Sequence, residues 1–534
     1  MSSKLTLYQY NLGTFSRKGT TSSHEAQTWF DRGLVWCYAF HHEESVRCFE
    51  KAIAEDEGFA MAYWGLAFAL GPNYNKPWNL FDEKELESTI RKINDANARA
   101  KASVSKGSEL EKALIDAVQL RVPDGLDEKS FRICNEAYAL AMQSVYEQFS
   151  GDLDVVSLYA DSIMNLSAWD LWDLKTGVFK HPGILHLYIH LMEMSKTPEV
   201  ALVAADHLRN LIPDAGHLVH MPSHLDILVG DYRRAIASNA DACLADEKYL
   251  AEHGGDNFYS FYRMHDYHSL IYAAMFAGQS EVALEAVTRM EKSLPESLLR
   301  IQSPPMADWL ENFASVRVHV LVRFGRWTDL IALPFPQHLD LYCVTTAMLH
   351  YGKGIAYASN GDIPNAEKHL AALEEAVSLI PSSRICGDFP NRSNVVLLVG
   401  TAMLAGELEY RKGNFSAAFT HLETAIARDD ALTYAEPWPW MMPTRHAYAA
   451  LLLEQGHVAD AAAAYRADLG FDDTLPRARQ HPGNVWALVG YHECLVRLGR
   501  GEEAGIVGQQ LRVARAVADV DVSVSCYCRG AGKK

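Results

Sequence analysis

The stretch WFDRGLVWCYAFHHEESVRCFEKA, residues 29–52, decides the fold of this chain. Its first half places one small residue between two tryptophans, and its second half places a phenylalanine between two small residues: Trp29, Gly33, Trp36, Ser45, Phe49 and Ala52. Side chains three and four positions apart share one face of a helix, so each half predicts a short helix. The small residue of one helix leaves room for the large residues of the other. The stretch therefore predicts two packed helices, a helical hairpin.

The same spacing begins again 34 residues later, at Tyr63, Ala67 and Leu70. Looser hairpins follow around Gly230, Gly278, Gly354, Gly406, Gly413, Gly456, Gly490 and Gly499. This period resembles the tetratricopeptide repeat, whose two-helix units stack into a right-handed solenoid. We predict an all-α, tetratricopeptide-like helical-hairpin solenoid that encloses a central cavity. Its expected parts are an N-terminal extension (1–19), N-terminal hairpins (20–295), C-terminal hairpins (296–525) and a tail (526–534).

The composition is that of a globular protein without a nucleic-acid or membrane partner. The 534 residues carry 49 Lys and Arg against 67 Asp and Glu, and no basic stripe for phosphates is visible. No stretch reaches the ~18 continuous apolar residues of a membrane span, and residues 1–17 lack the apolar core of a secretory signal. Nine scattered cysteines without a CxxC pair predict reduced thiols, with Cys526 and Cys528 in a packed tail. We expect a cytoplasmic protein.

Histidines are concentrated between His181 and His268, which hold ten of the 22 in the chain. Three sets have separations of three or four residues, which place side chains on one helical face: His186, His190 and Glu193; His217, His220 and His224; His265 and His268. Each set precedes a turn, so all three are predicted on the first helices of consecutive hairpins, which line the inner wall of such solenoids. Pro222 is predicted to kink the second of these helices.

Clustered imidazoles with one carboxylate are ligands for a borderline transition metal. We predict that a subset of these eight residues binds one or two ions, copper or iron first because nearly all candidates are imidazole, with zinc as the alternative. Glu193 is a candidate ligand, a candidate for orienting a histidine and a candidate catalytic base. Tyr188 and Tyr267 are the candidate catalytic tyrosines. The turn His41-His42-Glu43 is interpreted as a surface turn.

The histidine stretch resembles a family of tetratricopeptide-repeat proteins of bacteria and fungi. The resemblance is carried by HPG (181–183), HLYIH (186–190) and AGHLVHMPSH (215–224), and FDRGL (30–34), AYWGLA (62–67), GPN (71–73) and EPWPW (436–440) are also family-like. It implies the fold and no particular activity. The family usually has a longer connection before residue 181, and the short segment 173–180 weakens the case for His181 as a ligand.

Motifs of other chemistries are missing from the sequence: there is no GxGxxG that opens a helix, no Walker A sequence and no GxSxG. His186 and His190 have zincin spacing, but Leu187 stands where the general-base glutamate is needed. We therefore predict a metal-dependent oxidoreductase that acts on a small organic molecule, with dioxygen as the expected co-substrate. Two alternatives stay open: a non-catalytic peptide- or protein-binding scaffold, and a zinc-dependent hydrolase with Glu193 as its base.

Overall fold

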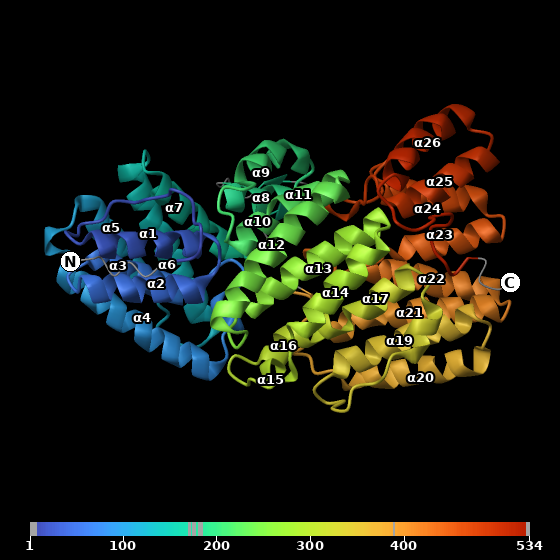
Figure 1. Ribbon diagram of the computed structural model, residues 1–534, viewed down its shortest axis with the longest axis horizontal. Helices are drawn as coiled ribbons and strands as arrows, with labels where there is room; N and C mark the ends of the chain where they lie inside the picture. The colour runs from blue at the N-terminus through green and yellow to red at the C-terminus, as the bar shows by residue number, and fades with distance from the viewer. Residues whose placement is uncertain (1–7, 169–171, 174–177, 180–184, 388–389, 530–534) are drawn as a thin grey trace. The chain divides into compact units, whose positions relative to one another are not determined.

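Helical hairpins dominate the computed structural model, which describes residues 8–168, 172–173, 178–179, 185–387 and 390–529 (Figure 1). Two short strands, β1 (Trp172–Asp173) and β2 (Val178–Phe179), form an antiparallel pair. All other regular elements in these ranges are helices, so the predicted all-α class with tetratricopeptide-like hairpins is confirmed. Within the described ranges, no helix combines the length and apolar character that crossing a bilayer requires.

The chain divides into two compact units. The first comprises Met1–Ser195, Val200–Pro222 and Asp241–Arg263, and the second comprises Lys196–Glu199, Ser223–Ala240 and Met264–Lys534. The helices of the first are α1 (His24–Tyr38), α2 (His42–Glu55), α3 (Ala60–Leu70), η1 (Trp78–Leu80), α4 (Glu83–Ser103), η2 (Val104–Lys106), α5 (Glu109–Gln119), α6 (Glu128–Phe149), α7 (Leu153–Met164), η3 (Asn165–Ser167), α8 (Leu185–Glu193), α9 (Leu202–Leu208) and α10 (Gly216–His220). The expected division after residue 295 does not coincide with this one.

Four helices are divided between the units: η4 (Pro198–Ala201), α11 (Pro222–Val229), α12 (Tyr232–His253) and α13 (Ser260–Ala277). The remaining helices belong to the second unit: α14 (Ser280–Lys292), α15 (Glu296–Leu299), α16 (Met306–Leu310), η5 (Glu311–Ser315), α17 (Val316–Arg323), α18 (Trp327–Ala332), α19 (Cys343–Ser359), α20 (Ile363–Leu379), α21 (Ser393–Arg411), α22 (Phe415–Asp430), α23 (Thr444–Glu454), α24 (Val458–Asp468), η6 (Arg477–Arg479), α25 (Val485–Arg497) and α26 (Gly501–Arg515).

One turn geometry closes eight hairpins in the described chain. The amide after the turn donates to the carbonyl five residues earlier, as from Asp231 to Asp226 at 2.8 Å. The residue before that amide has a positive φ, and in seven turns it is Gly230, Gly278, Gly325, Gly361, Gly413, Gly456 or Gly499. Glycine adopts this left-handed conformation without a steric penalty, so it ends the helix and reverses the chain. The turn between α1 and α2 has Phe40 there instead, with φ 57°.

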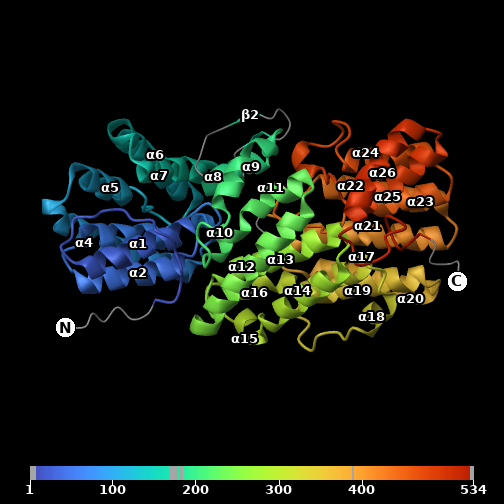
Figure 2. The same cartoon turned by 45° about the horizontal axis from the view of Figure 1, so that its top comes forward.

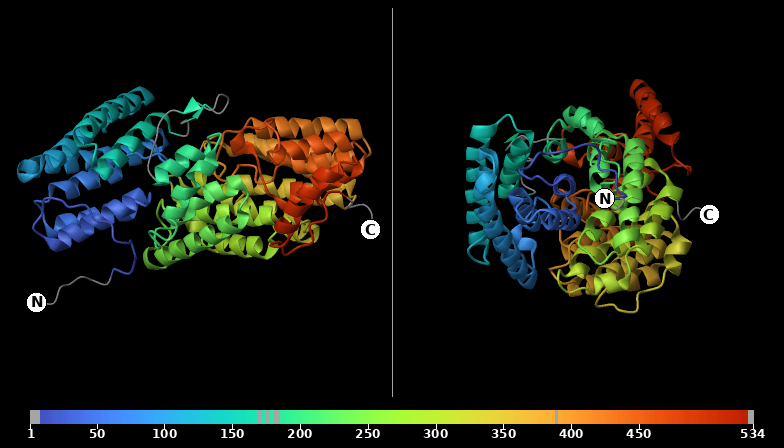
Figure 3. Two further views of the ribbon diagram at one scale, coloured as in Figure 1. Left: turned by 90° about the horizontal axis from the view of Figure 1, so that it is seen from above. Right: turned by 60° about the vertical axis from the view of Figure 1, so that its left-hand side comes forward.

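Small residues let the helices of a hairpin approach closely. A Cβ atom added to Gly33 would lie 2.7 Å from the Phe49 ring, and the Ser45 hydroxyl donates to the Gly33 carbonyl at 2.7 Å. In the second unit, Figure 2 shows α19 beside α20 and α21 beside α22, and the left view of Figure 3 shows the orange helices of this unit lying side by side. The positions that predicted the first hairpin are therefore its helix contacts.

The helix that contains AGHLVHMPSH is interrupted at Met221. Helix α10 ends at His220 and α11 begins at Pro222. Proline has no N–H to donate to the carbonyl four residues earlier, Leu218, and its ring crowds that carbonyl. The predicted irregularity at Pro222 is confirmed.

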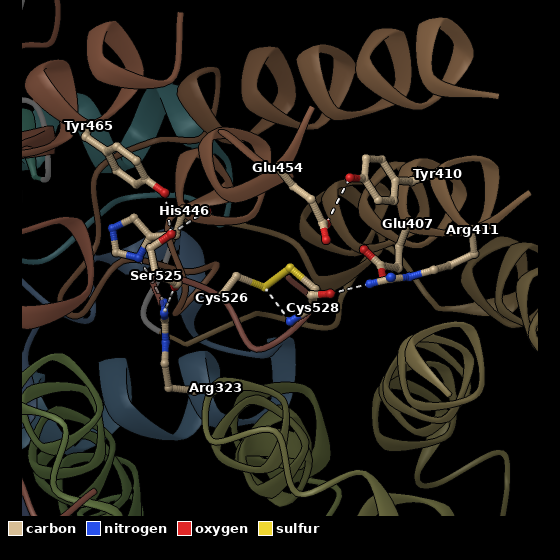
Figure 4. Close-up of a disulfide and its surroundings, with 10 residues drawn as sticks. All are labelled: Arg323, Glu407, Tyr410, Arg411, His446, Glu454, Tyr465, Ser525, Cys526 and Cys528. Carbon is tan, nitrogen blue, oxygen red and sulfur yellow. Dashed lines mark hydrogen bonds and ion pairs between the residues drawn. A yellow bond between two sulfur atoms is a disulfide. The ribbon is translucent and has the colours of Figure 1, made fainter. Parts of the chain in front are cut away.

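The C-terminal tail packs against helices of the second unit, to which it belongs (Figure 4). The Ser525 hydroxyl donates to the carbonyl of His446 at 3.1 Å, and Arg411 donates to the carbonyl of Cys528. The packed tail is thus confirmed. Cys526 and Cys528 form a disulfide, so the prediction of reduced thiols is wrong for this pair. The other seven cysteines, all in the described chain, form no disulfide.

Candidate metal centre and cavity

His186, His190 and His217 come together in the first unit. One ring nitrogen of each lies within 4.8 Å of the others, and none of the three residues is more than 8% exposed. Helix α8 supplies His186 and His190 one turn apart, and α10 supplies His217. Three imidazole nitrogens this close together can ligate one transition-metal ion.

Hydrogen bonds fix the orientation of two of these rings. Nδ1 of His186 lies 3.0 Å from the carbonyl oxygen of Tyr38, and Nδ1 of His190 lies 2.9 Å from Oε1 of Glu193. A carbonyl and an ionised carboxylate only accept, so both Nδ1 atoms carry the proton and Nε2 bears the lone pair that binds a metal. Of the three roles considered for the fully buried Glu193, this geometry favours the orienting one.

Phe40 contacts all three histidines. Its ring centroid lies 4.5 Å from that of His186, 5.5 Å from that of His217 and 6.3 Å from that of His190. A positive φ is rare for a residue with a large side chain and is commonest where function fixes the backbone. Phe40 was not among the predicted site residues. The signal that could have identified it is the phenylalanine at a turn position where the seven other hairpin turns of this geometry have glycine.

The interpretation of His41 and His42 as a surface turn is wrong. His41 is 1% exposed, and its ring stacks on that of Tyr259 with 3.5 Å between centroids and meets that of Tyr249 edge-on at 4.1 Å. His42 lines the cavity described next. Burial lowers the pKa of both imidazoles, that of His42 to about 3, so both are neutral at physiological pH.

A cavity of about 540 Å³ lies beside His186 in the first unit. Its volume is in the range of small-molecule sites. Most of its wall is apolar and includes Val35, Phe40, Phe68, Leu158, Leu187 and Leu218. His186 and Phe40 belong both to the histidine group and to the wall, so a molecule bound here lies next to the candidate metal centre.

The two candidate tyrosines are placed differently. Tyr188 lies on α8 but is not among the described residues that line the cavity. Tyr267 lies in the second unit, fully buried, with its ring 5.6 Å from the guanidinium of Arg289. A catalytic role for either tyrosine stays a prediction.

The other predicted ligands are buried as well. The ring of His220 lies 5.6 Å from that of His217 in the first unit. In the second unit, Nδ1 of His224 lies 3.0 Å from Oε2 of Glu436, and the His265 ring lies 6.0 Å from that of His224. Burial, with the nearby His265 and His319, lowers the pKa of His268 to about 3. Glu436 was missed by the sequence analysis, and His181 lies outside the described residues.

Comparisons with known proteins add no family. No protein-family model matches the chain, and no curated protein matches it. Among solved structures, it is similar to the APC/C hetero-tetramer Cut9–Hcn1 at 13% identity, TM-score 0.30, over 86% of this chain and 77% of that one. It is also similar to yeast Tom70 at 11% identity, TM-score 0.30, over 92% of this chain and 93% of that one. A third similar structure is Naa15/Naa10 bound to HypK-THB, at 14% identity, TM-score 0.22, over 92% of this chain and 70% of that one. Likenesses of this size carry no argument about function.

Proposed function

We propose that this chain is a helical-hairpin scaffold whose first unit binds a transition-metal ion through His186, His190 and His217 and a small organic molecule in the adjacent cavity. The observation that carries the proposal is the pair of hydrogen bonds to Nδ1 of His186 and His190. Histidines that ligate metals almost always donate their second N–H to a carbonyl or a carboxylate in this way. Both bonds present Nε2 as the ligand atom.

Copper and iron are the ions that we expect first. Three imidazoles without a thiolate suit either ion, and zinc accepts the same set. With a redox-active ion, the narrower proposal is an oxidoreductase that acts on the molecule in the cavity, with dioxygen as co-substrate. The protein's own contribution is the apolar wall, which holds the molecule beside the histidines and keeps water away.

A non-catalytic binding scaffold is the second candidate, and the hairpin fold favours it because stacked helical hairpins form extended binding surfaces. The cavity volume favours a small molecule over a long peptide as the ligand of the first unit. The zinc-dependent hydrolase has less support, because the carboxylate that it needs as a base, Glu193, is buried and bonded to His190.

Metal analysis of the chain purified without a histidine tag tests the proposal. After growth with copper, iron and zinc, we expect about one ion per chain, and His190→Ala and His217→Ala should each weaken binding at least about tenfold. His207→Ala, an exposed histidine of the same unit, is the matched control and should retain the ion. Sub-stoichiometric metal in every supplement refutes the metal centre. A fully loaded protein that consumes no oxygen across a substrate screen refutes the oxidoreductase and leaves the scaffold.

A further inference from the structure

One part of the cavity wall carries buried polar groups. Arg121 is 5% exposed and Asp161 is 9% exposed, and Nη2 of Arg121 lies 4.0 Å from Oδ2 of Asp161. Arg121 also donates to the carbonyl of Phe68 at 2.8 Å and to that of Pro72. Both residues and His42 line the cavity, whose remaining wall is mostly apolar. Arg121, Asp161 and His42 therefore form a polar part of the cavity wall.

Asp161 and His42 have polar atoms that are available to a ligand. Oδ2 of Asp161 and both ring nitrogens of His42 make no hydrogen bond of normal geometry within the described part of the chain. Burial, with the charges of Arg121 and Lys76, lowers the pKa of His42 to about 3, and the Ala69 carbonyl nearby only opposes this shift. The single N–H of neutral His42 faces the Ala69 carbonyl, which leaves the other ring nitrogen as an acceptor for a ligand. Buried polar groups without partners cost free energy, which a ligand with matching groups recovers.

The charges around this polar part of the wall are already compensated within the chain. Three pairs do this: Arg121 with Asp161, Asp154 with Arg17, and Lys76 with Glu85, the last two at 2.6 Å. A carboxylate on the ligand would face Asp161 and an ammonium group would face Arg121, each without a counter-charge of its own. A hydroxyl group avoids both conflicts, since it is uncharged and can donate its hydrogen to Asp161 or to the acceptor nitrogen of His42.

We propose that the cavity binds a neutral, mostly apolar alcohol or phenol whose hydroxyl group contacts Asp161 and His42. The apolar wall takes the hydrocarbon skeleton, and the polar part of the wall beside Arg121 selects the head group. This inference rests on the proposed function, because it names the class of molecule bound in that cavity, but it does not depend on the metal.

A head-group series on one chain length tests it. Decan-1-ol, decanoate, decylammonium and methyl nonyl ether compete for the cavity with the neutral fluorescent probe N-phenyl-1-naphthylamine on the full-length protein at pH 7.5. We expect decan-1-ol to bind about tenfold or more tightly than either ion, and more tightly than the ether, which cannot donate to Asp161. Equal or tighter binding of decanoate, decylammonium or the ether overturns the inference.

The variant Asp161→Asn provides a second test, because an increase in the affinity for one ligand cannot result from a loss of structure. It removes the counter-charge of Arg121, so decanoate should gain at least about tenfold while decan-1-ol weakens. An unchanged preference overturns the inference, and the head-group series on the unmodified chain decides if the variant does not fold. If no probe binds although metal loads fully, the cavity inference fails and the metal centre stands. If decan-1-ol binds although no metal loads, the metal centre fails and the inference stands.

Discussion

Replacing Glu193 with glutamine isolates the orienting bond at the candidate metal centre. The substitution keeps the size of a side chain that has no exposed surface and contacts Nδ1 of His190 at 2.9 Å. The amide group can donate to Nδ1, which moves the imidazole proton to Nε2, the nitrogen that would bind the ion. The variant should fold and should ligate the metal less well.

The expected loss follows from the type of contact. Removal of a partner that orients a metal-ligating histidine typically costs about 10–100-fold in metal affinity, or about 1.4–2.7 kcal/mol. One of the two orienting bonds remains, the bond from His186 to the Tyr38 carbonyl, so we expect a weakened site and not an abolished one. Competition with a chromophoric chelator gives the Kd for copper and for zinc at pH 7.5. Both Kd values should rise by a similar factor, since the bond fixes ring orientation and not redox state.

Glu50→Gln is the matched control, because Glu50 is an exposed glutamate on α2 of the same unit. Its metal affinity should equal that of the unmodified chain. A Glu193→Gln protein with an unchanged helical circular dichroism spectrum and an unchanged Kd would refute the orienting role, and with it the main support for the metal centre.

Three further results are expected. In urea unfolding, the free energy of unfolding of Phe40→Gly should exceed that of Phe40→Ala by about 1 kcal/mol. Both variants lose the ring, but only glycine adopts a φ of 57° without a steric penalty. Equal stability of the two variants contradicts this expectation. Burial lowers the pKa of His319 in the folded protein to about 3. Below about pH 6.5, the unfolded chain binds a proton at this residue that the folded chain does not bind, so the free energy of unfolding decreases as the pH is lowered. Between pH 7.5 and 4.5, the free energy of unfolding should fall by about 2–3 kcal/mol more for the unmodified chain than for His319→Gln, and parallel pH curves would reject the assignment. Copper at about 100 times its Kd should raise the free energy of unfolding by about 2.7 kcal/mol, and the same rise in His217→Ala would place the ion elsewhere.

Local patterns were enough to predict the helical hairpins. Gly33 and Phe49 are packed together because the first helix needs a gap where the second has a ring, and both positions are visible in one short stretch. The break at Pro222 follows from proline chemistry alone. The helical faces of His186 and His190 could be predicted for the same reason, since a separation of four residues fixes the face.

Partners from distant parts of the chain could not be predicted. Tyr38 lies 148 residues before His186, and nothing in either segment indicates that its carbonyl meets the imidazole. The polar residues of the turn at His41 suggested a surface, but Tyr249 and Tyr259, about 200 residues away, cover it. The buried charges of Arg121 and Asp161 likewise look in the sequence like those of solvated helix faces.

The interleaved division of the chain has a consequence for its synthesis. The first unit is built from Met1–Ser195, Val200–Pro222 and Asp241–Arg263, with segments of the second unit between them. At about 5–20 residues per second, roughly 3–14 seconds separate translation of Ser195 from that of Arg263. Helix α8 is synthesised first, His217 follows, and Tyr259 comes later still. Until His217 is present the histidine group is incomplete, and until Tyr259 is present the His41 ring lacks one of the two tyrosines that pack against it. Nascent chains halted before residue 217 should expose this unfinished core to chaperones, and no single cut in the finished protein separates the two units from each other.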